Sequence, residues 1–587
     1  MQNILDILSE KLGAAFEKAG YDKNLGKVTI SNRPDLCEYQ CNGAMAGAKQ
    51  YKCAPFVIAG AVAKELENET AFEKVEVVNP GFINIKISDE YLSDYIEKMA
   101  ADEKMGVEVK TGKMAVIDYG GANVAKPLHV GHLRSAIIGE TIKRLKRFKG
   151  DTVIGDVHLG DWGLQMGLII EQLRCEQPDL VYFDDSYEGE YPDTPPFTIS
   201  ELEQIYPKAS AKSKVDADFK EKAQTATLEL QKGKRAYRAI WKHILSVSIA
   251  DLKKNYGNLN VEFDLWKGES DAEEFIGPMV EDMINKGYAH ESQGAMVVDV
   301  MEDTDQKEIP PCIIKKSDGA SLYATSDLAT IIQRKRDYNP DEIIYVVDKR
   351  QEMHFTQVFR TAKKTKLVDD NITFKFLGFG TMNGKDGKPF KTRDGGVMRL
   401  ETLISDINKA VFDKMMENRE IDEKEALETS KIVGLSALKY GDLSNQASKD
   451  YVFDLDRFTS FEGNTGPYIL YTIVRIKSIL RKYMEAHNTI EGLKLNKTLA
   501  PTEKQLMLEI SKFNAMIDNA YEELAPHKIC AYIYDLANAF NSFYHENKIM
   551  SQEDARKQEG FVALLVDTKK ALELSIDILG IKAPDRM

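Results

Sequence analysis

The sequence predicts an α/β protein whose centre is a doubly wound parallel sheet, with an α+β domain before it and an all-α bundle after it. The first observation is an apolar stretch at 114–119, a glycine-containing loop at 120–129 and an amphipathic segment at 133–148. A second apolar stretch follows at 152–154. Strand, loop, helix and strand in this order form the βαβ unit of a parallel sheet.

The same alternation returns in the second half of the chain. An apolar strand at 342–347 leads into a helix from about residue 352, and a strand at 372–379 precedes a helix at 400–416. Open sheets of this kind bind ligands at the carboxyl ends of their strands, near the point where the strand order reverses. We therefore look for a site in the loop that follows the first strand.

The two ends of the chain have different patterns. Near the N-terminus, apolar residues from Ile4 to Phe16 recur at helical spacing, and the stretches 75–78 and 82–87 are typical of strands. From residue 424 onward almost every segment has the helical period, which predicts a helical bundle.

We predict four parts along the 587 residues: an N-terminal α+β domain, a doubly wound domain, a helical connector and a helical bundle, at 1–110, 111–410, 411–460 and 461–587. An insertion at about 171–255 interrupts the second part. Its beginning is acidic and rich in proline, which indicates a surface loop. Its remainder is rich in Lys, Glu, Gln and Ala, which predicts exposed helix.

Composition limits the class of protein. The chain has 78 basic and 93 acidic side chains, a net charge of -15, which disfavours a surface that binds nucleic acid everywhere but allows a local basic patch. The longest apolar run, 56–63, is too short to span a membrane, and the acidic N-terminus resembles no signal peptide. We expect a cytoplasmic protein.

The six cysteines are too few for a disulfide scaffold. Cys37, Cys41 and Cys53 lie close together and raise the alternative of a metal site. Their spacing matches no common zinc pattern, and no histidine is near. We interpret them as small buried residues and predict no protein-bound metal.

The strongest motif is Asn-Val-Ala-Lys-Pro-Leu-His-Val-Gly-His-Leu-Arg-Ser at 123–135, between the first strand and its helix. A helix N-terminus carries unpaired N–H groups and partial positive charge, which suit a phosphate. His129 and His132 lie on one side of the first turn and can donate hydrogen bonds to phosphoryl oxygens, while Gly131 leaves room for a flat base. Two histidines three residues apart could also bind a metal or have no special role.

Charge is uneven around this motif. Residues 126–149 contain seven basic side chains and one acid, Glu140, a local excess of +6. RNA binding through backbone phosphates requires such a local patch, but for Lys143 to Lys149 a solvated helix face explains the pattern equally well. Tyrosines of the bundle could stack on unpaired bases, although most of them should be core: Tyr468, Tyr471, Tyr483, Tyr532, Tyr534 and Tyr544.

The motif at 123–135 resembles the ATP-binding signature of class I aminoacyl-tRNA synthetases, in the form carried by arginyl-tRNA synthetases. Four further segments resemble the same family in order along the chain: 155–163, 323–329, 345–354 and 463–468. The terminal Ala-Pro-Asp-Arg-Met is similar to the family's Pro-Glu-Arg-Met, with Asp in place of Glu.

The resemblance implies a class I Rossmann-like catalytic domain and a two-step reaction. The arginine carboxylate attacks the α-phosphorus of ATP, and the arginyl group of the adenylate then passes to the 2′-hydroxyl of the terminal adenosine of tRNA(Arg). ATP, accompanied by Mg²⁺, is expected to contact Lys126, His129, Gly131, His132 and His354. The N-terminal domain would contact the D-loop and the bundle would bind the anticodon. A cytoplasmic monomer is expected.

The second class I signature, Lys-Met-Ser-Lys-Ser, departs from its usual form. It appears here as Pro-Phe-Lys-Thr-Arg-Asp-Gly at 389–395, with Thr392 at the position of the second lysine. Many arginyl enzymes share this loss, and Lys126 is the candidate that replaces the charge. We expect Lys391 and Arg393 to assist catalysis, the alternative being a solvated turn.

Arginine selection requires acids, because a guanidinium is a permanent cation with five fixed donors. The family's guanidinium positions correspond to Glu269, Tyr323 and Asp327, of which Glu269 is the weakest match. Asp327 could instead cap a helix. The α-ammonium and carboxylate of arginine are expected to bind Asn123 and Gln351, with Asp118 nearby.

Three other interpretations remain open. A synthetase for lysine or glutamate is closest, although two acids would repel glutamate. A small-molecule nucleotidyltransferase with the same His-x-Gly-His fold would leave the bundle without a role. A non-catalytic acidic interaction protein predicts that ATP gives His129 no protection.

Overall fold

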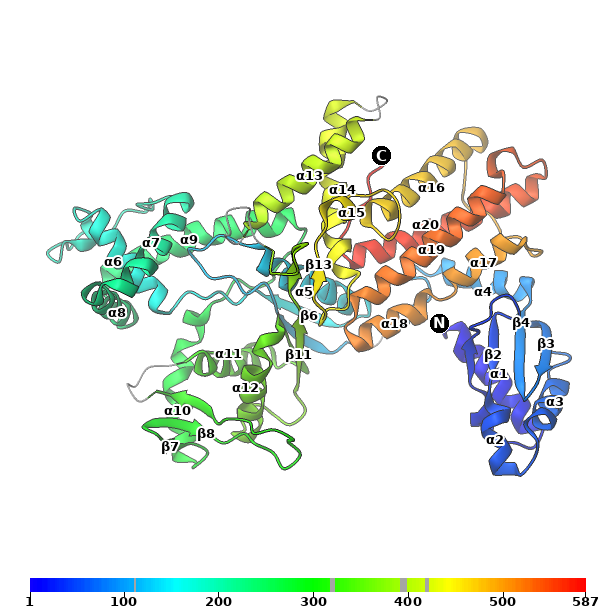
Figure 1. Ribbon diagram of the computed structural model, residues 1–587, viewed down its shortest axis with the longest axis horizontal. Coiled ribbons are helices and arrows are strands. Elements are labelled where there is room, and N and C mark those ends of the chain that lie inside the picture. The colour runs from blue at the N-terminus through cyan, green and yellow to red at the C-terminus, as the bar shows by residue number, and fades with distance from the viewer. Residues whose placement is uncertain (110–111, 317–321, 391–397, 418–421) are drawn as a thin grey trace.

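The computed structural model describes residues 1–109, 112–316, 322–390, 398–417 and 422–587. Figure 1 shows an extended molecule, with the N-terminal domain at one end and a group of helices, α6–α9, at the other. The central sheet and helix α5 lie between them, and the helices of the C-terminal bundle cross from the centre toward the N-terminal domain.

The N-terminal domain packs helices against an antiparallel sheet in the order β1-β2-β4-β3. Its elements are α1 (Ile4–Lys18), η1 (Lys23–Gly26), β1 (Val28–Ile30), β2 (Tyr39–Cys41), α2 (Gly43–Tyr51), α3 (Pro55–Glu65), β3 (Phe72–Val78), β4 (Phe82–Ile87) and α4 (Asp89–Ala101). Apolar residues of α1 at helical spacing, including Leu8, Leu12 and Phe16, are fully buried. Helix α4 connects this domain to the bundle, where the Ser93 hydroxyl donates to the Asn496 carbonyl at 2.6 Å.

The central sheet confirms the predicted parallel α/β fold. Its four strands are all parallel, in the order β11-β10-β5-β6. They are β5 (Met114–Asp118), β6 (Thr152–Asp156), β10 (Glu342–Asp348) and β11 (Thr373–Phe379). Helix α5 (Val130–Phe148) connects the two neighbouring strands β5 and β6. The carboxyl end of β5 therefore lies beside the N-terminus of α5, where the sequence predicts the site.

Between β6 and β10 the chain builds two side structures. The first consists of helices that we call the insertion helices: α6 (Leu164–Glu176), α7 (Ile199–Val215), α8 (Ala217–Gln231) and α9 (Arg235–Asn258), with η2 (Val181–Phe183). The second contains η3 (Glu269–Ala272), α10 (Glu273–Asn285), α11 (Tyr323–Tyr338) and the small antiparallel sheet β7 (His290–Ser292), β8 (Ala295–Val298) and β9 (Cys312–Lys315).

The expectation that the insertion is exposed helix is wrong for one face of its helices. α9 buries Ile240, Ile244 and Leu252 completely or almost so, and α8 buries Phe219 and Leu230. The polar residues that dominate the composition occupy the other faces. The insertion therefore has its own packed interior and can hold a defined position against the loop after β5.

The remaining helices complete the molecule. η4 (Lys349–Gln351) and α12 (Glu352–Lys364) follow β10, and α13 (Leu400–Met416) follows β12 (Met382–Asn383). β12 pairs in parallel with β13 (Tyr451–Val452), which comes later in the chain. The bundle contains α14 (Glu423–Leu443), α15 (Leu455–Phe458), α16 (Gly466–His487), α17 (Pro501–Ile510), α18 (Phe513–Glu523), α19 (Pro526–Glu546), η5 (Ile549–Ser551) and α20 (Ala555–Ile578).

Helix α5 is the internal axis of the molecule. One side of it contacts β5, β6 and β10, and other sides contact α13, α14, α18, α19 and α20. As a result the basic residues near its C-terminal end are inside the protein: Lys143, Lys146 and Lys149 are each at most 2% exposed. Neither an RNA-binding patch nor a solvated face is correct for these three residues, because Lys143 contacts the Glu262 carbonyl and α18 of the bundle contacts Lys146 and Lys149.

Each buried ammonium is paired with an acid or a carbonyl. Lys146 Nζ forms ion pairs with Glu342 of β10 and with Asp151, the latter at 2.7 Å. The Tyr521 hydroxyl of α18 donates to the same Asp151 carboxylate at 2.7 Å. Lys149 pairs with Asp518 of α18. These contacts join the central sheet to the bundle. Buried charges are stable only when they are paired, so the sheet and the bundle depend on each other here.

A further buried lysine, Lys439, joins three parts of the chain. Lys439 Nζ of α14 donates to the carbonyls of Leu259 and Gly580 at 3.0 and 2.9 Å. These carbonyls lie at the C-terminal ends of α9 and α20, where helix dipoles concentrate negative potential. Burial lowers the pKa of Lys439 to about 7. The insertion, helix α14 and the C-terminal helix α20 meet at this ammonium.

Within the described part of the chain, no helix combines the length and apolar character needed to cross a bilayer. Cys37 and Cys41 are buried in the N-terminal domain, where the Cys37 thiol lies 3.2 Å from the Ser31 hydroxyl.

We predict that Lys146→Met destabilises the protein by about 3–5 kcal/mol, because it leaves the buried Asp151 and Glu342 carboxylates without their shared cation. Urea denaturation of the variant measures this loss. Lys409→Met is the matched control, because its ion pair with Asp413 is exposed and should contribute at most about 1 kcal/mol. Equal losses for the two variants would contradict the buried network. A large loss of tRNA affinity in folded Lys146→Met would restore the RNA interpretation.

Candidate active site

The loop after β5 is held against the segment that follows β6. The Val124 N–H donates to the Gly160 carbonyl at 3.2 Å, and Asn123 pairs with Gly160 in a parallel bridge. A Cβ on Gly160 would lie 2.2 Å from Asn123 Oδ1, so glycine is required there for this side chain to fit. Asn123, predicted to bind arginine, is thus fixed at the carboxyl edge of the sheet.

His129 and His132 form the N-terminal cap of α5. His129 Nδ1 accepts a hydrogen bond from the Gly131 N–H at 3.0 Å, and His132 Nδ1 accepts one from the His129 N–H at 3.2 Å. The two rings lie 3.9 Å apart between centroids. Because both Nδ1 atoms accept, a neutral imidazole at either position must carry its proton on Nε2. Each ring thus retains one N–H donor that the cap does not use.

Both imidazoles favour the neutral form. Burial lowers the pKa of His132 to about 3, with His129 and Lys126 adding repulsion. Burial also lowers the pKa of His129, and the Lys126 ammonium contributes in the same direction. Near neutral pH the cap therefore presents neutral N–H donors, and the positive charge at this end of α5 comes from Lys126 and the helix dipole.

Gly131 is required by the cap itself. A Cβ at this position would lie 2.7 Å from His129 Cε1 and 2.8 Å from His129 Nδ1, so any side chain would displace the ring. The sequence suggested that Gly131 makes room for a nucleotide base. The space next to it is occupied by His129, which gives a local reason for glycine that does not depend on a ligand.

The segment 398–400, which follows the second signature, forms backbone hydrogen bonds with residues 128–130 of the first signature. The Val130 N–H donates to the Met398 carbonyl at 3.1 Å, and the Leu400 N–H donates to the Leu128 carbonyl at 3.0 Å. His129 and Arg399 are therefore antiparallel neighbours. Lys391 and Arg393 lie outside the described residues, and their predicted roles stay predictions.

An acidic region lies where η3, α11 and α12 pack together. Asp327 of α11 contacts His354 of α12, with Oδ2 and Nε2 2.5 Å apart. Glu269 begins η3, and burial raises the pKa of its carboxyl to about 7; His158 opposes this shift, and the charges of Asp161 and Asp327 add to it. The region concentrates negative charge that only a cation can fully stabilise. His354, predicted to contact ATP, is engaged with the acid predicted to bind guanidinium.

Asp118 has a different environment from the one expected. Arg334 of α11 is 1% exposed, and its Nη2 atom lies 2.7 Å from Asp118 Oδ2 and 2.8 Å from Asp156 Oδ2. We predicted that the Asp118 carboxylate lies near the α-ammonium of a substrate. In the structure it forms an ion pair with this internal guanidinium. Arg334 was missed because its helix has an ordinary charged sequence that gives no sign of burial.

Other predicted residues lie at the rim of the acidic region. Tyr323, the first residue of α11, is 76% exposed, and Gln351 at the end of η4 is also exposed. His158 is a residue that sequence reasoning missed. Within the described residues neither of its buried ring nitrogens has a hydrogen-bond partner, and its φ of 41° is unusual for a residue with a side chain.

The bundle tyrosines divide as expected between core and surface. Tyr483 and Tyr532 are buried, Tyr468 and Tyr534 are half-buried, and Tyr471 and Tyr544 are 38% and 36% exposed. We call the exposed pair with Arg475 the tyrosine platform. The Arg475 guanidinium lies 4.6 Å from the Tyr471 ring centroid and 5.2 Å from that of Tyr544. Exposed aromatic faces next to a cation suit unpaired bases.

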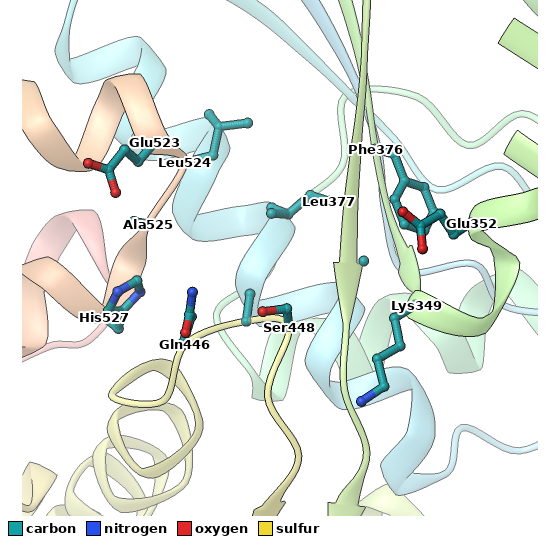
Figure 2. A pocket seen from close by; sticks show the side chains of 12 residues that line it. Lys349, Glu352, Phe376, Leu377, Gln446, Ser448, Glu523, Leu524, Ala525 and His527 are labelled. Carbon is teal, nitrogen blue, oxygen red and sulfur yellow. The ribbon is translucent and has the colours of Figure 1, made fainter. Parts of the chain in front are cut away.

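A separate hollow of about 410 Å³ lies between the sheet edge and the bundle. Figure 2 shows Leu377 of β11 on one side, Gln446 and Ser448 below it, and His527 near the corner between α18 and α19. None of the described residues that line it is a predicted substrate residue. It is a gap between domains rather than a part of the His129–His132 site.

The fold and this cap together define a class of protein. The molecule has a parallel sheet, and a His-x-Gly-His motif begins the helix after the first strand of that sheet. This motif pairs with the segment after a second signature, and a helical bundle follows the sheet domain. This is the architecture of a class I aminoacyl-tRNA synthetase.

Comparisons identify the member of this class. Residues 96–455 match the model for tRNA synthetases class I (R), catalytic domain, residues 469–587 match the DALR anticodon binding domain, and residues 2–87 match the arginyl tRNA synthetase N terminal domain. Curated arginine–tRNA ligases from Agathobacter rectalis and Alkaliphilus oremlandii are 62% and 56% identical, each over 100% of both chains. The chain belongs to the arginyl-tRNA synthetase family.

Solved structures of arginyl-tRNA synthetases match the fold of this chain. The arginyl-tRNA synthetase from Plasmodium falciparum matches with a TM-score of 0.81 at 25% identity, over 100% of both chains. The one from Thermus thermophilus, with a TM-score of 0.78 at 20% identity over 100% of both chains, shares the fold.

We predict that His132 stays neutral, with its proton on Nε2, across the range in which an ordinary imidazole titrates, about one pH unit on either side of 6.5. The reason is its burial, which lowers its pKa to about 3. Nitrogen chemical shifts of the labelled imidazole measure both properties, with His132→Asn providing the assignment. Titration within that range, or a proton on Nδ1, would contradict the cap geometry.

Proposed function

We propose that this chain joins L-arginine to tRNA(Arg) in two steps at the N-terminus of α5, through an arginyl-adenylate. The observation that carries the proposal is the neutral His129–His132 cap, with two Nε2–H donors and the Lys126 ammonium at a helix N-terminus. Family membership supports the substrates: the related proteins are named arginine–tRNA ligases.

In the first step the arginine carboxylate attacks the α-phosphorus of ATP, and pyrophosphate leaves. Negative charge grows on the phosphoryl oxygens in the transition state. Donors placed before the reaction stabilise this charge without reorganisation. We assign this role to His129 and His132 through Nε2, and we assign Lys126 to the departing phosphates. Lys391 and Arg393 are proposed to assist.

Recognition of the substrate side chain rests on Glu269 and Asp327. Burial raises the pKa of the Glu269 carboxyl to about 7, and the nearby charges of Asp161 and Asp327 add to this shift, so a cation beside it would stabilise the ionised form. A guanidinium would provide that cation and donate two parallel N–H hydrogen bonds to a carboxylate, whereas a lysine ammonium is a point charge. We propose Tyr323 as a further contact of the guanidinium, and Asn123 and Gln351 as contacts of the α-ammonium and carboxylate.

In the second step the 2′-hydroxyl oxygen of the terminal adenosine attacks the arginyl carbonyl carbon of the adenylate, the hydroxyl loses its proton, and AMP leaves as the ester forms. The remainder of the tRNA must then reach two distant surfaces. We propose that the tyrosine platform of α16 and α19 binds anticodon bases by stacking, and that the N-terminal domain contacts the D-loop. The buried Lys143, Lys146 and Lys149 take no part in this binding.

We further propose that Mg²⁺ accompanies ATP. Among the described residues there is no group of three or more histidine, cysteine or acidic side chains arranged to hold a metal, so the ion would be bound mainly by the phosphates. His354 and Gly131 are proposed to lie next to the nucleotide. A monomer in the cytoplasm is the arrangement that the family resemblance favours.

Charging of purified tRNA(Arg) with each of the twenty amino acids tests this function. We expect product with arginine alone, and we expect pyrophosphate exchange to require tRNA. Charging with lysine or glutamate would assign another synthetase. Exchange that tRNA does not affect would favour a small-molecule nucleotidyltransferase.

Asp327→Asn should raise the KM for arginine by at least about tenfold and change the KM for ATP little, because a charge-assisted hydrogen bond to the substrate becomes a neutral one. Steady-state aminoacylation measures both constants. Equal effects on the two would reassign Asp327 to a structural role such as helix capping.

Arginine affinity should depend on pH through Glu269. The free carboxyl has a pKa of about 7, and a bound guanidinium lowers it, so arginine binding favours the ionised form and releases a proton. Below pH 7 the Kd for arginine should therefore rise, by at most about tenfold per pH unit, and above pH 7 it should level off.

Calorimetry in buffers of different ionisation enthalpy measures both the affinity and the released proton. Glu269→Gln should bind arginine more weakly at neutral pH and lose this part of the pH dependence. A pH-dependent Kd that persists unchanged in Glu269→Gln would show that another group is responsible.

A further inference from the structure

The insertion helices contact three consecutive residues of the loop that leads to His129. The Gln165 side chain of α6 donates to the Val124 carbonyl. The Ala125 N–H donates to the Ser248 hydroxyl of α9 at 2.9 Å in a buried contact. The ammonium of Lys126 then lies 4.6 Å from the centroid of the Tyr206 ring of α7. Three separate helices thus hold the backbone and side chains of this short stretch.

The contact at Ala125 holds an unfavourable backbone conformation. Ala125 has a φ of 60°, in the left-handed region that residues with a Cβ seldom adopt. Such a conformation persists only when the surroundings determine it. Ser248 satisfies the buried N–H of this residue, so α9 stabilises the change in chain direction that immediately precedes Lys126.

The Lys126 ammonium is already near the cap in the free protein. Its charge lowers the pKa of both His129 and His132, which places it within electrostatic range of the two imidazoles. A free lysine side chain would lose much rotamer freedom on taking one position. The Tyr206 ring limits that freedom in advance, because an aromatic face attracts an ammonium.

Helix α7 is also attached to the segment after the second signature. Glu203 Oε2 lies 2.8 Å from Arg399 Nη1, and Arg399 is the antiparallel neighbour of His129. Glu203 and Tyr206 are three residues apart, so they project from one side of α7. This side of the helix therefore contacts Lys126, which precedes His129 in the chain, and Arg399, which lies opposite His129.

We propose that Tyr206 is a positioning residue of the ATP phosphate site, and that its ring holds the Lys126 ammonium where the phosphates arrive. The inference rests on the proposed role of Lys126 and extends it to the insertion. The insertion helices then form one wall of the nucleotide site, with Ser248 fixing the backbone and Tyr206 fixing the charge.

Kinetics of Tyr206→Leu and Tyr206→Phe test the proposal. Leucine removes the aromatic face, and we expect the KM for ATP to rise by between about twofold and thirtyfold. The KM for arginine should not change. Phenylalanine keeps the face and should restore a KM for ATP near that of the unmodified enzyme. If Tyr206→Phe is as impaired as Tyr206→Leu, the ring is not the cause and the proposal is wrong.

Phe219→Leu is a matched control within the same insertion. The Lys212 ammonium lies 4.5 Å from the Phe219 ring centroid, a similar contact that does not involve the loop at 124–126. We expect this variant to keep the KM for ATP, with thermal denaturation used to confirm that both variants are folded. An equal rise in the KM for ATP would show that general loosening of the insertion, rather than the Lys126 contact, explains the result.

The double variant Lys126→Met, Tyr206→Leu separates this inference from the function on which it rests. If Tyr206 acts through Lys126, adding Tyr206→Leu to Lys126→Met should have almost no further effect on the KM for ATP. Full additivity, or an unimpaired Tyr206→Leu beside an impaired Lys126→Met, would overturn the role of Tyr206 and leave that of Lys126 intact. An unimpaired Lys126→Met would overturn both.

Discussion

One constraint organises this protein: helix α5 must be buried along its length and open at its first turn. Its flanks contact the sheet on one side and the bundle on others, so every charge it carries inward needs a partner. Its N-terminus carries unpaired N–H groups and two imidazole N–H donors, and the proposed phosphate site requires these donors to stay free. The ion pairs of Lys146 and Lys149 and the cap of His129 and His132 are the two consequences of this constraint.

Neutrality is the important property of the cap. A protonated pair of histidines would repel each other at a centroid distance of 3.9 Å and would also repel Lys126. Burial keeps both rings neutral, and the cap hydrogen bonds leave their N–H groups on Nε2. The acidic region shows the opposite case, because burial and the neighbouring acids Asp161 and Asp327 raise the pKa of Glu269 and disfavour its ionised form. Donors for an anion and acceptors for a cation are thus both prepared without a ligand.

The local parts of this architecture could be predicted because their causes are local. Apolar runs and helical periods predicted the strands β5, β6, β10 and β11 and the helices between them, and the His-x-Gly-His motif predicted a site at the N-terminus of α5. The resemblance to the arginyl-tRNA synthetases is confirmed over the whole chain. The acids Glu269 and Asp327 were found from motifs that lie far from His129 in sequence, and their binding roles stay predictions.

What only the tertiary structure decided is which charged side chains are inside. Lys143, Lys146 and Lys149 have the spacing of a basic surface, yet all three are buried. Residue Glu262 contacts the first of them, and α18 of the bundle, hundreds of residues later, contacts the other two. Arg334 forms an ion pair with the carboxylate of Asp118. The Tyr206 ring contacts the Lys126 ammonium, although the composition of its helix indicates only exposure. A sequence pattern records the period of one element. Burial depends on which other element packs against it, and long-range contacts determine that.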